Sequence, residues 1–197
     1  MQKLRESPAT MLAKEEITTI EMEYLERVFK YLISHDKNKP KKHEASVSWM
    51  DIATVLLKLG LNPSRSECKL IVWEVDDDLD EHINWNEFKN MYKRCIMKNS
   101  ELEPRKLYNL VMFLMYDSKE FKGSVTVEET LQILFVRNGR DQLDLEIQAI
   151  FGEDQKNIDG VEKSINYKDF LDKIQQRNRN DFLAWEEMMC KKKIPLG

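Results

Sequence analysis

The sequence is poor in glycine, proline and cysteine, and each shortage excludes a class of protein. Only 6 of the 197 residues are glycine and 5 are proline. So few turn-forming residues argue against a β-sandwich and against a glycine-rich nucleotide-binding fold, and they favour helices. The three cysteines are scattered, as Cys68, Cys95 and Cys190. An odd, unclustered set is neither a disulfide framework nor a zinc site, and it is typical of a reducing cytosol.

Long apolar runs and an excess of basic charge are also lacking. The longest apolar run falls far short of the roughly 20 residues that span a bilayer, and the start, MQKLRESPATMLAKEE, lacks the apolar core of a signal peptide. Lys and Arg number 31 against 35 Asp and Glu, for a net charge of −4, whereas a nucleic-acid binder needs a basic face. We therefore expect a cytoplasmic protein that binds neither membranes nor nucleic acid.

Catalytic motifs are missing as well. The sequence contains no G-x-S-x-G, P-loop, H-E-x-x-H or G-x-G-x-x-G pattern. Its histidines, His35, His43 and His82, fall near expected loops without cysteine or acidic partners at ligand spacing. We expect a protein that is not an enzyme.

Helical periodicity is what the sequence does have. Apolar residues at helical spacing predict eight helices, arranged as four helix-loop-helix units in two pairs divided near Ser100. Capping-box patterns at Thr18 with Glu21, and at Ser64 with Glu67, mark two helix starts. The fold class is therefore all-α. The expected segments are an arm over 1–16, a first pair over 17–99, a second pair over 100–177 and a helical extension over 178–197.

Each helix-loop-helix unit carries one β-branched residue in its loop. These residues are Val47, Ile83, Val125 and Ile165. We expect Val47 to pair with Ile83, and Val125 with Ile165, as short antiparallel bridges between the loops of each pair.

The acidic stretch DDDLDEHINWNE, between two predicted helices, is the strongest chemical signal. Calcium takes six to eight oxygen ligands, which a twelve-residue loop supplies from positions 1, 3, 5, 7, 9 and 12. With Asp76 at position 1, position 7 contributes its backbone carbonyl and position 12 is the bidentate carboxylate. The expected metal ligands are Asp76, Asp78, Asp80, His82, Asn84 and Glu87.

This loop departs from the pattern at position 6, where Glu81 replaces glycine. The position needs a positive φ, which a residue with a side chain resists by roughly 1–2 kcal/mol. Since about 1.4 kcal/mol is a tenfold change in affinity, we expect a weakened site rather than a lost one. A relic loop that keeps its shape without metal is the alternative.

The other three loops are not expected to bind calcium. Pro40 and Lys42 stand at positions 1 and 3 of the first loop, and Asp169 replaces the long glutamate of the fourth. In the third loop, Gly123 at position 6 places Ser118 at position 1 and Lys122 at position 5, with Glu129 at position 12. Lys122 puts a cation where an oxygen ligand is needed.

Residues 51–88, DIATVLLKLGLNPSRSECKLIVWEVDDDLDEHINWNEF, resemble the calmodulin superfamily. The LGLNP linker, the EVD before the acidic loop and the EF after it match the end of one EF-hand and the whole of the next. The resemblance covers residues 17–177 more loosely and implies two EF-hand pairs. The segments WEVDDDLDEHINWNEF and LVMFLMYDS…SVTVEETLQILFVR…GRDQL…IFG are also similar in style to EF-hand subunits of ciliary axonemes, such as the calmodulin-like member of the outer-dynein-arm docking complex.

Two features point to a protein partner. The helix predicted over 107–116 is apolar on nearly every face, so one pair of EF-hands does not easily cover it. The tail RNDFLAWEEMMCKKKIPLG carries large apolar residues at helical spacing, and docking onto its own chain or onto a partner both fit. The expected partner-binding residues are Leu110, Met112, Phe113, Met115, Trp185 and Met188.

Three functions follow as hypotheses. The first is an adaptor or structural subunit of a larger cytoskeletal assembly, in a cilium or flagellum axoneme by the resemblance. It would bind a helical or coiled-coil segment and have at most one calcium site. The second is a free calcium sensor that grips target helices in a methionine-lined groove. The third is an EF-hand regulatory subunit of an enzyme.

Overall fold

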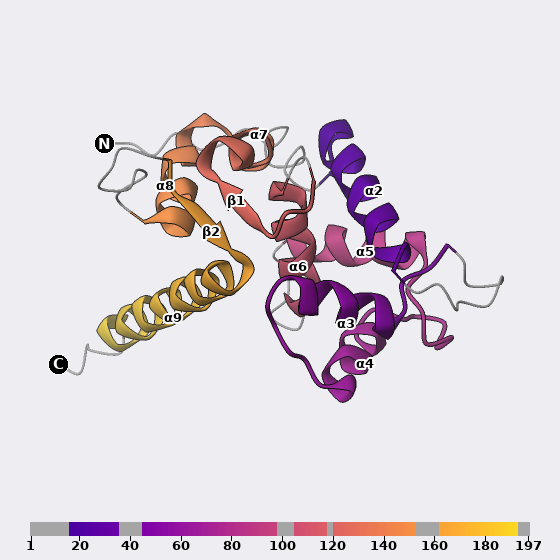
Figure 1. The fold of residues 1–197 in the computed structure, drawn as a ribbon. Coiled ribbons are helices and arrows are strands. Elements are labelled where there is room, and N and C mark those ends of the chain that lie inside the picture. The colour runs from indigo at the N-terminus through magenta and orange to yellow at the C-terminus, as the bar shows by residue number, and fades with distance from the viewer. Residues whose placement is uncertain (1–15, 36–44, 98–104, 118–119, 153–161, 193–197) are drawn as a thin grey trace.

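The described part of the protein is mostly helical in a computed structural model (Figure 1). The structure describes residues 16–35, 45–97, 105–117, 120–152 and 162–192, with side chains up to Asn180. The elements are α2 (Thr19–Ile33), α3 (Trp49–Lys58), α4 (Arg65–Trp73), α5 (Trp85–Ile96), α6 (Arg105–Tyr116), β1 (Ser124–Thr126), α7 (Val127–Asn138), α8 (Arg140–Phe151), β2 (Ser164–Asn166) and α9 (Tyr167–Lys192). The all-α fold is the one that the sequence predicts.

Capping boxes begin five of these helices. In each, the N-cap side chain accepts from the N3 amide, and the N3 carboxylate accepts from the N-cap amide. The boxes predicted at Thr18 with Glu21 and at Ser64 with Glu67 are confirmed. Others begin α3, α5 and α7. Because these pairs lie three residues apart, the sequence locates these helix starts without any tertiary information.

The loops pair as expected. Val47 and Ile83 form an antiparallel bridge through two backbone hydrogen bonds, of 2.8 and 2.9 Å. In the second half, β1 and β2 pair antiparallel with Val125 opposite Ile165. All four side chains are buried, so each bridge joins two loops over the core.

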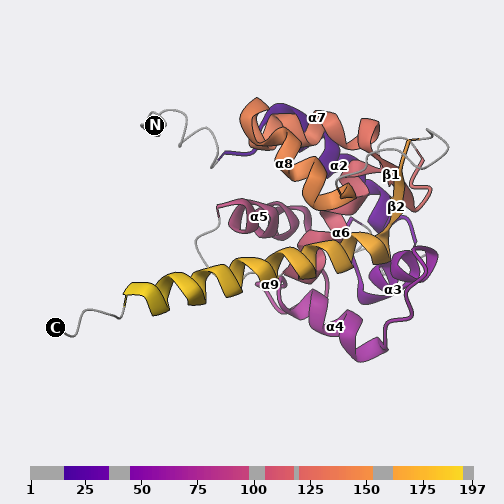
Figure 2. The same ribbon diagram turned by 90° about the vertical axis from the view of Figure 1, so that its left-hand side faces the viewer.

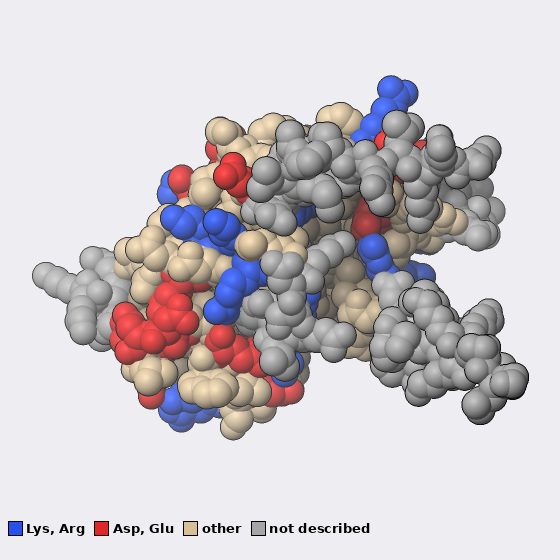
Figure 3. Space-filling view, turned by 180° about the vertical axis from the view of Figure 1, so that it is seen from behind, with Lys and Arg blue, Asp and Glu red and all other residues tan. Residues whose placement is uncertain are grey.

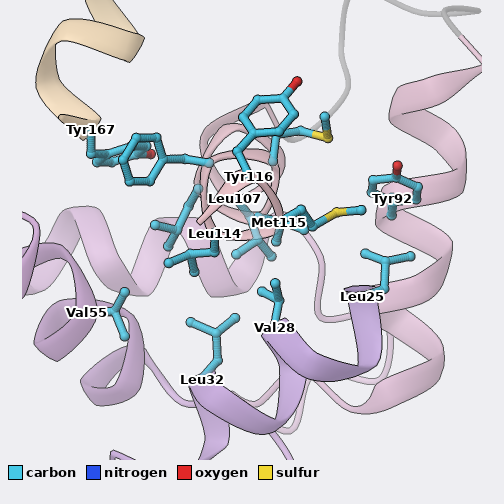
Figure 4. Packing of buried hydrophobic residues seen from close by; sticks show 14 of the residues in the cluster. Leu25, Val28, Leu32, Val55, Tyr92, Leu107, Leu114, Met115, Tyr116 and Tyr167 are labelled. Atoms are coloured by element: carbon cyan, nitrogen blue, oxygen red, sulfur yellow. The ribbon is translucent and has the colours of Figure 1, made fainter. Parts of the chain in front are cut away.

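Helix α6 lies at the centre of a core that both halves of the chain share. It packs against α5, α7 and α9, and also against α2 from the first half. Figure 4 shows Leu25, Val28 and Leu32 of α2 lying opposite Leu114 and Met115 of α6. The two pairs of helix-loop-helix units are therefore packed into one body.

This packing covers the residues expected to bind a partner. Leu110 and Met112 are 1% and 8% exposed, and Phe113 and Met115 are 0% exposed. The excess apolar surface of α6 is real, but the chain's own helices, α2 from the first half among them, cover it where we had expected another chain or the tail. These four side chains consequently offer no surface for docking in this structure.

Helix α9 runs without a break from Tyr167 to Lys192, so the last predicted helix and the start of the extension are continuous. Figure 2 shows its C-terminal part reaching beyond the other helices. Side chains from 181 onwards lie outside the described residues, including Trp185 and Met188, as do residues 1–15 of the expected arm. Within the described segments, no helix combines the length and apolar character needed to cross a membrane.

Candidate metal centre

Three aspartates converge in the loop between α4 and α5. One carboxylate oxygen from each of Asp76, Asp78 and Asp80 lies within 4.8 Å of the others. Asp76 is buried at 7% exposure, whereas Asp78 is exposed and open to an approaching ion. Figure 3 shows acidic side chains gathered on this side of the molecule. The structure thus brings together the three acids predicted at positions 1, 3 and 5.

Glu87, at position 12, closes the loop from its far end. Its carboxylate accepts the Asn84 amide through Oε2 at 2.8 Å and the Asp77 amide through Oε1 at 2.9 Å. The residue is 5% exposed. The carboxylate is thus held inside the loop next to the start of α5, although it is not one of the close group of three aspartates.

Backbone amides shape the rest of the loop. Asp76 accepts from the Glu81 amide at 2.8 Å and from the Asp80 amide at 3.1 Å. Asp80 in turn accepts from the His82 amide at 2.9 Å. These bonds hold the carboxylates in place before any ion arrives, which reduces the ordering that binding requires.

Asn84 is committed to capping helix α5. Its Oδ1 accepts from the amides of Asn86, at 2.9 Å, and Glu87, at 3.2 Å. Position 9 of such loops often reaches the ion through a water molecule. Asn84 therefore suits an indirect role, whereas the aspartates suit direct ligation.

The backbone is left-handed at two positions of the loop. Glu81 has φ 63°, as its place at position 6 predicts, and Leu79 has φ 59°. Each costs roughly 1–2 kcal/mol relative to an ordinary conformation. Lys69 lies 3.6 Å from the Glu81 carboxylate, but both side chains are exposed and such a pair contributes little. Position 4 carries no signal in our sequence reading, so the strain at Leu79 was missed.

Sequence reasoning also missed a buried polar cluster between the two halves. Glu21, which is 0% exposed, accepts from the Tyr92 hydroxyl at 2.9 Å and lies 3.5 Å from the Arg137 guanidinium. Burial raises the pKa of Tyr92 well above its usual value, so the hydroxyl stays protonated and donates. The cluster ties α2 to α5 and α7. Its only sequence signal was the role of Glu21 in a capping box.

Arg27 makes a second tie between the halves. From α2 its guanidinium donates to three backbone carbonyls at the end of α6: Leu114 at 3.0 Å, Met115 at 3.1 Å and Asp117 at 2.8 Å. The last carbonyls of a helix have no partner within it, so this contact satisfies groups that otherwise need water. The guanidinium also lies over the Phe121 ring, 4.8 Å from its centroid.

Comparison with known proteins agrees with this geometry. Residues 47–95 match the family model described as an EF-hand domain pair. They are an EF-hand pair. The chain is also similar to putative calmodulin-like protein 6 of Oryza sativa subsp. japonica, with 25% identity over 134 residues, 66% of this chain and 73% of that protein. It is 27% identical to troponin C of Todarodes pacificus over 131 residues, 66% of this chain and 82% of that protein.

An EF-hand pair implies calcium binding, and the donors of the loop 76–87 suit that ion. Calcium is a hard cation that prefers oxygen, and the loop presents three aspartates and a glutamate at the required spacing. Pro40 and Lys42 of the first loop, and residues 153–161 of the fourth, lie outside the described residues. Asp169 stands in the first turn of α9, where its amide donates to Asn166 at 2.9 Å.

Proposed function

We propose that this EF-hand, calmodulin-like chain is a non-enzymatic adaptor subunit of a larger protein assembly, with one calcium site in the loop 76–87. The observation that carries the proposal is the burial of α6 by α2. A calmodulin-like sensor binds targets by opening a hydrophobic groove within a pair of EF-hands. Here the apolar surfaces of the two pairs pack against each other. This packing suits an adaptor whose shape does not change with calcium.

Two polar contacts support the same conclusion. Separating α2 from the second pair would leave the Glu21 carboxylate without the Arg137 charge, and it would strip Arg27 from the end of α6. An unpaired buried charge costs several kcal/mol. Opening the pairs in the manner of a sensor would therefore have to overcome both losses.

The identity of the partner and of the assembly is inferred from the sequence resemblance to axonemal EF-hand subunits alone. We propose a helical or coiled-coil segment of a cytoskeletal complex as the partner, and the ciliary axoneme as the place to look for it. Purification of the tagged full chain from ciliated cells would test this. Recovery with axonemal proteins supports the proposal, whereas recovery with soluble enzymes or with calcium-dependent target peptides refutes it.

A free calcium sensor is the second candidate. It is favoured by the similarity to calmodulin-like and troponin C chains, and by the position of the acidic loop at the start of α5, the helix that carries Tyr92. Calcium titration with a dye for exposed apolar surface separates the two candidates. The adaptor should bind one ion with little change in dye fluorescence, whereas the sensor should show a marked increase.

A further inference from the structure

The third helix-loop-helix unit closes its loop with the same bonds as the calcium loop. In the calcium loop Asp76 accepts the amide of position 6, and Glu87 accepts the amide of Asn84 at position 9. In the third unit Asp117 accepts the Gly123 amide at 2.8 Å, and Glu129 accepts the Thr126 amide at 2.9 Å.

The correspondence shifts the start of the third loop by one residue. Gly123 at position 6 had placed Ser118 at position 1, but the carboxylate that holds this amide belongs to Asp117. Asp117 is 0% exposed, and its second oxygen, Oδ1, has no hydrogen-bond partner among the described residues. A buried, half-satisfied carboxylate therefore stands at the start of the loop, where a cation is electrostatically favoured.

Lys122, within the same loop, supplies such a cation. The ammonium of Lys122 donates to Glu129 Oε1 at 2.8 Å, which links the middle of the loop to its last acid. The hydrogen bond to Glu129 raises the pKa of Lys122, and Asp117 and Glu120 raise it further through their charge. Burial raises the pKa of Asp117, whereas hydrogen bonds from the Gly123 and Lys122 amides and, to a smaller extent, the Lys122 charge act against that rise. The ammonium thus bonds to Glu129 at the end of the loop, and its charge acts on Asp117 at the start.

We infer that Lys122 serves the third loop as a built-in cation, doing for Asp117 and Glu129 what a calcium ion does for an acidic EF-hand loop. The loop is thereby closed at every calcium concentration and takes up no ion of its own. The consequence reaches the interface between the pairs. Phe121, next to Lys122, stacks on Tyr31 of α2 with ring centroids 3.8 Å apart and lies under Arg27.

The test uses the full chain with Glu87→Gln as the parent, so that the loop 76–87 does not obscure the result. Without calcium, Lys122→Met should lower the Tm of the parent by about 2–4 °C, and Lys122→Arg should restore most of the loss. Lys30→Met is the matched control, because Lys30 forms an exposed pair with Glu26 on α2. A loss in Lys122→Met no larger than in Lys30→Met would reduce Lys122 to an ordinary surface ion pair and overturn the inference.

Calcium binding is the second test. The parent should show no calcium binding by calorimetry and no rise in Tm with calcium. Lys122→Asp in the parent replaces the cation with an oxygen donor and should create one calcium site that raises the Tm. A parent that binds calcium, or a folded Lys122→Asp variant that calcium does not stabilise, contradicts the inference. The proposed site in the loop 76–87 is judged separately, by calcium titration of the wild type against Glu87→Gln.

Discussion

The second and third loops are closed by corresponding hydrogen bonds, but their side chains are chemically opposite. The loop 76–87 gathers three aspartates, holds Leu79 and Glu81 at positive φ, and has no lysine among its residues. The loop from Asp117 to Glu129 has glycine at position 6 and a lysine bonded to its last acid. The loop 76–87 therefore carries mutual repulsion among its acids that a divalent ion relieves, whereas the third loop has little left for an ion to stabilise.

The largest expected effect comes from a substitution in the core that both halves of the chain share. Phe113→Ala empties the centre of α6, where the ring is 0% exposed and contacts Tyr167 and Phe170. We expect a loss of about 3–5 kcal/mol in the free energy of unfolding. Urea unfolding followed by far-UV and by tryptophan signals should give one coincident transition, since the core is shared. Two separate transitions would show that the pairs fold independently.

Glu87→Gln should abolish the difference between the loops in calcium binding. The carboxylate would lose its charge, and a charged ligand contributes about 1.5–3 kcal/mol. Affinity should therefore fall by roughly 10- to 100-fold, which takes the already weakened site below what calorimetry detects. Isothermal titration calorimetry measures this, with Glu74→Gln just before the loop as the control that keeps the ligands. Equal calcium affinity in Glu87→Gln and Glu74→Gln would show that calcium does not bind in the loop 76–87.

Exchanging the residues at position 6 sharpens the comparison. Gly123 has φ 82°, so Gly123→Ala should cost about 1–2 kcal/mol in the free energy of unfolding. Glu81→Gly relieves the same kind of strain and should gain about 0.5–1 kcal/mol, less than the strain itself because glycine loses more entropy on folding. Chemical denaturation of both variants without calcium measures the sign of each change in the free energy of unfolding. Matching signs would mean that the two positions are not equivalent.

The smallest effect is a dependence on pH in the third loop. Partial burial raises the pKa of Glu129, but the Lys122 hydrogen bond and the Thr126 amide outweigh it, so the pKa lies below its ordinary value of 4.5. A lowered carboxyl pKa stabilises the fold above about pH 4.5, and that stability is lost as the pH falls through the folded pKa. We expect about 0.3–1 kcal/mol, because the pair is partly solvated.

The measurement for Glu129 is the Tm difference between the wild type and Glu129→Gln from about pH 3 to pH 7. Asp117 titrates with the opposite sign, since burial raises its pKa, but it is present in both proteins and so its contribution largely cancels. A difference that stays constant over this range would exclude the charged pair as its source.

Local pattern was enough to predict most of the fold. Capping boxes fixed helix starts such as Thr18 and Ser64, and the β-branched residues predicted the bridges at Ile83 and Ile165. The strands β1 and β2 extend the single bridge predicted between Val125 and Ile165 to three residue pairs, from Ser124–Asn166 to Thr126–Ser164. Strands of three residues, shorter than one helical turn, leave no periodicity to detect.

The sequence could not predict the contacts between the pairs. Glu21 and Arg137 are far apart in the chain, and both are residue types that usually stay on the surface. The excess apolar surface of α6 was visible, but several covers were possible, and only the packing of α2 against it decides among them. In the loop 76–87 the ligand positions were predictable from spacing. In the third loop, placing Gly123 at position 6 put the start at Ser118, one residue too late, because only the hydrogen bond from the Gly123 amide identifies Asp117 as the first acid.

The cap that Arg27 places on α6 has a consequence for how the chain can be divided. A backbone cut between residues 97 and 105 separates the two EF-hand pairs covalently, but α2 and α6 fall in different fragments and each still carries half of one core. Such fragments should reassociate and complement each other when mixed, whereas either one alone should aggregate. Gene fusions or tags that treat the halves as portable modules would therefore separate a single folding unit.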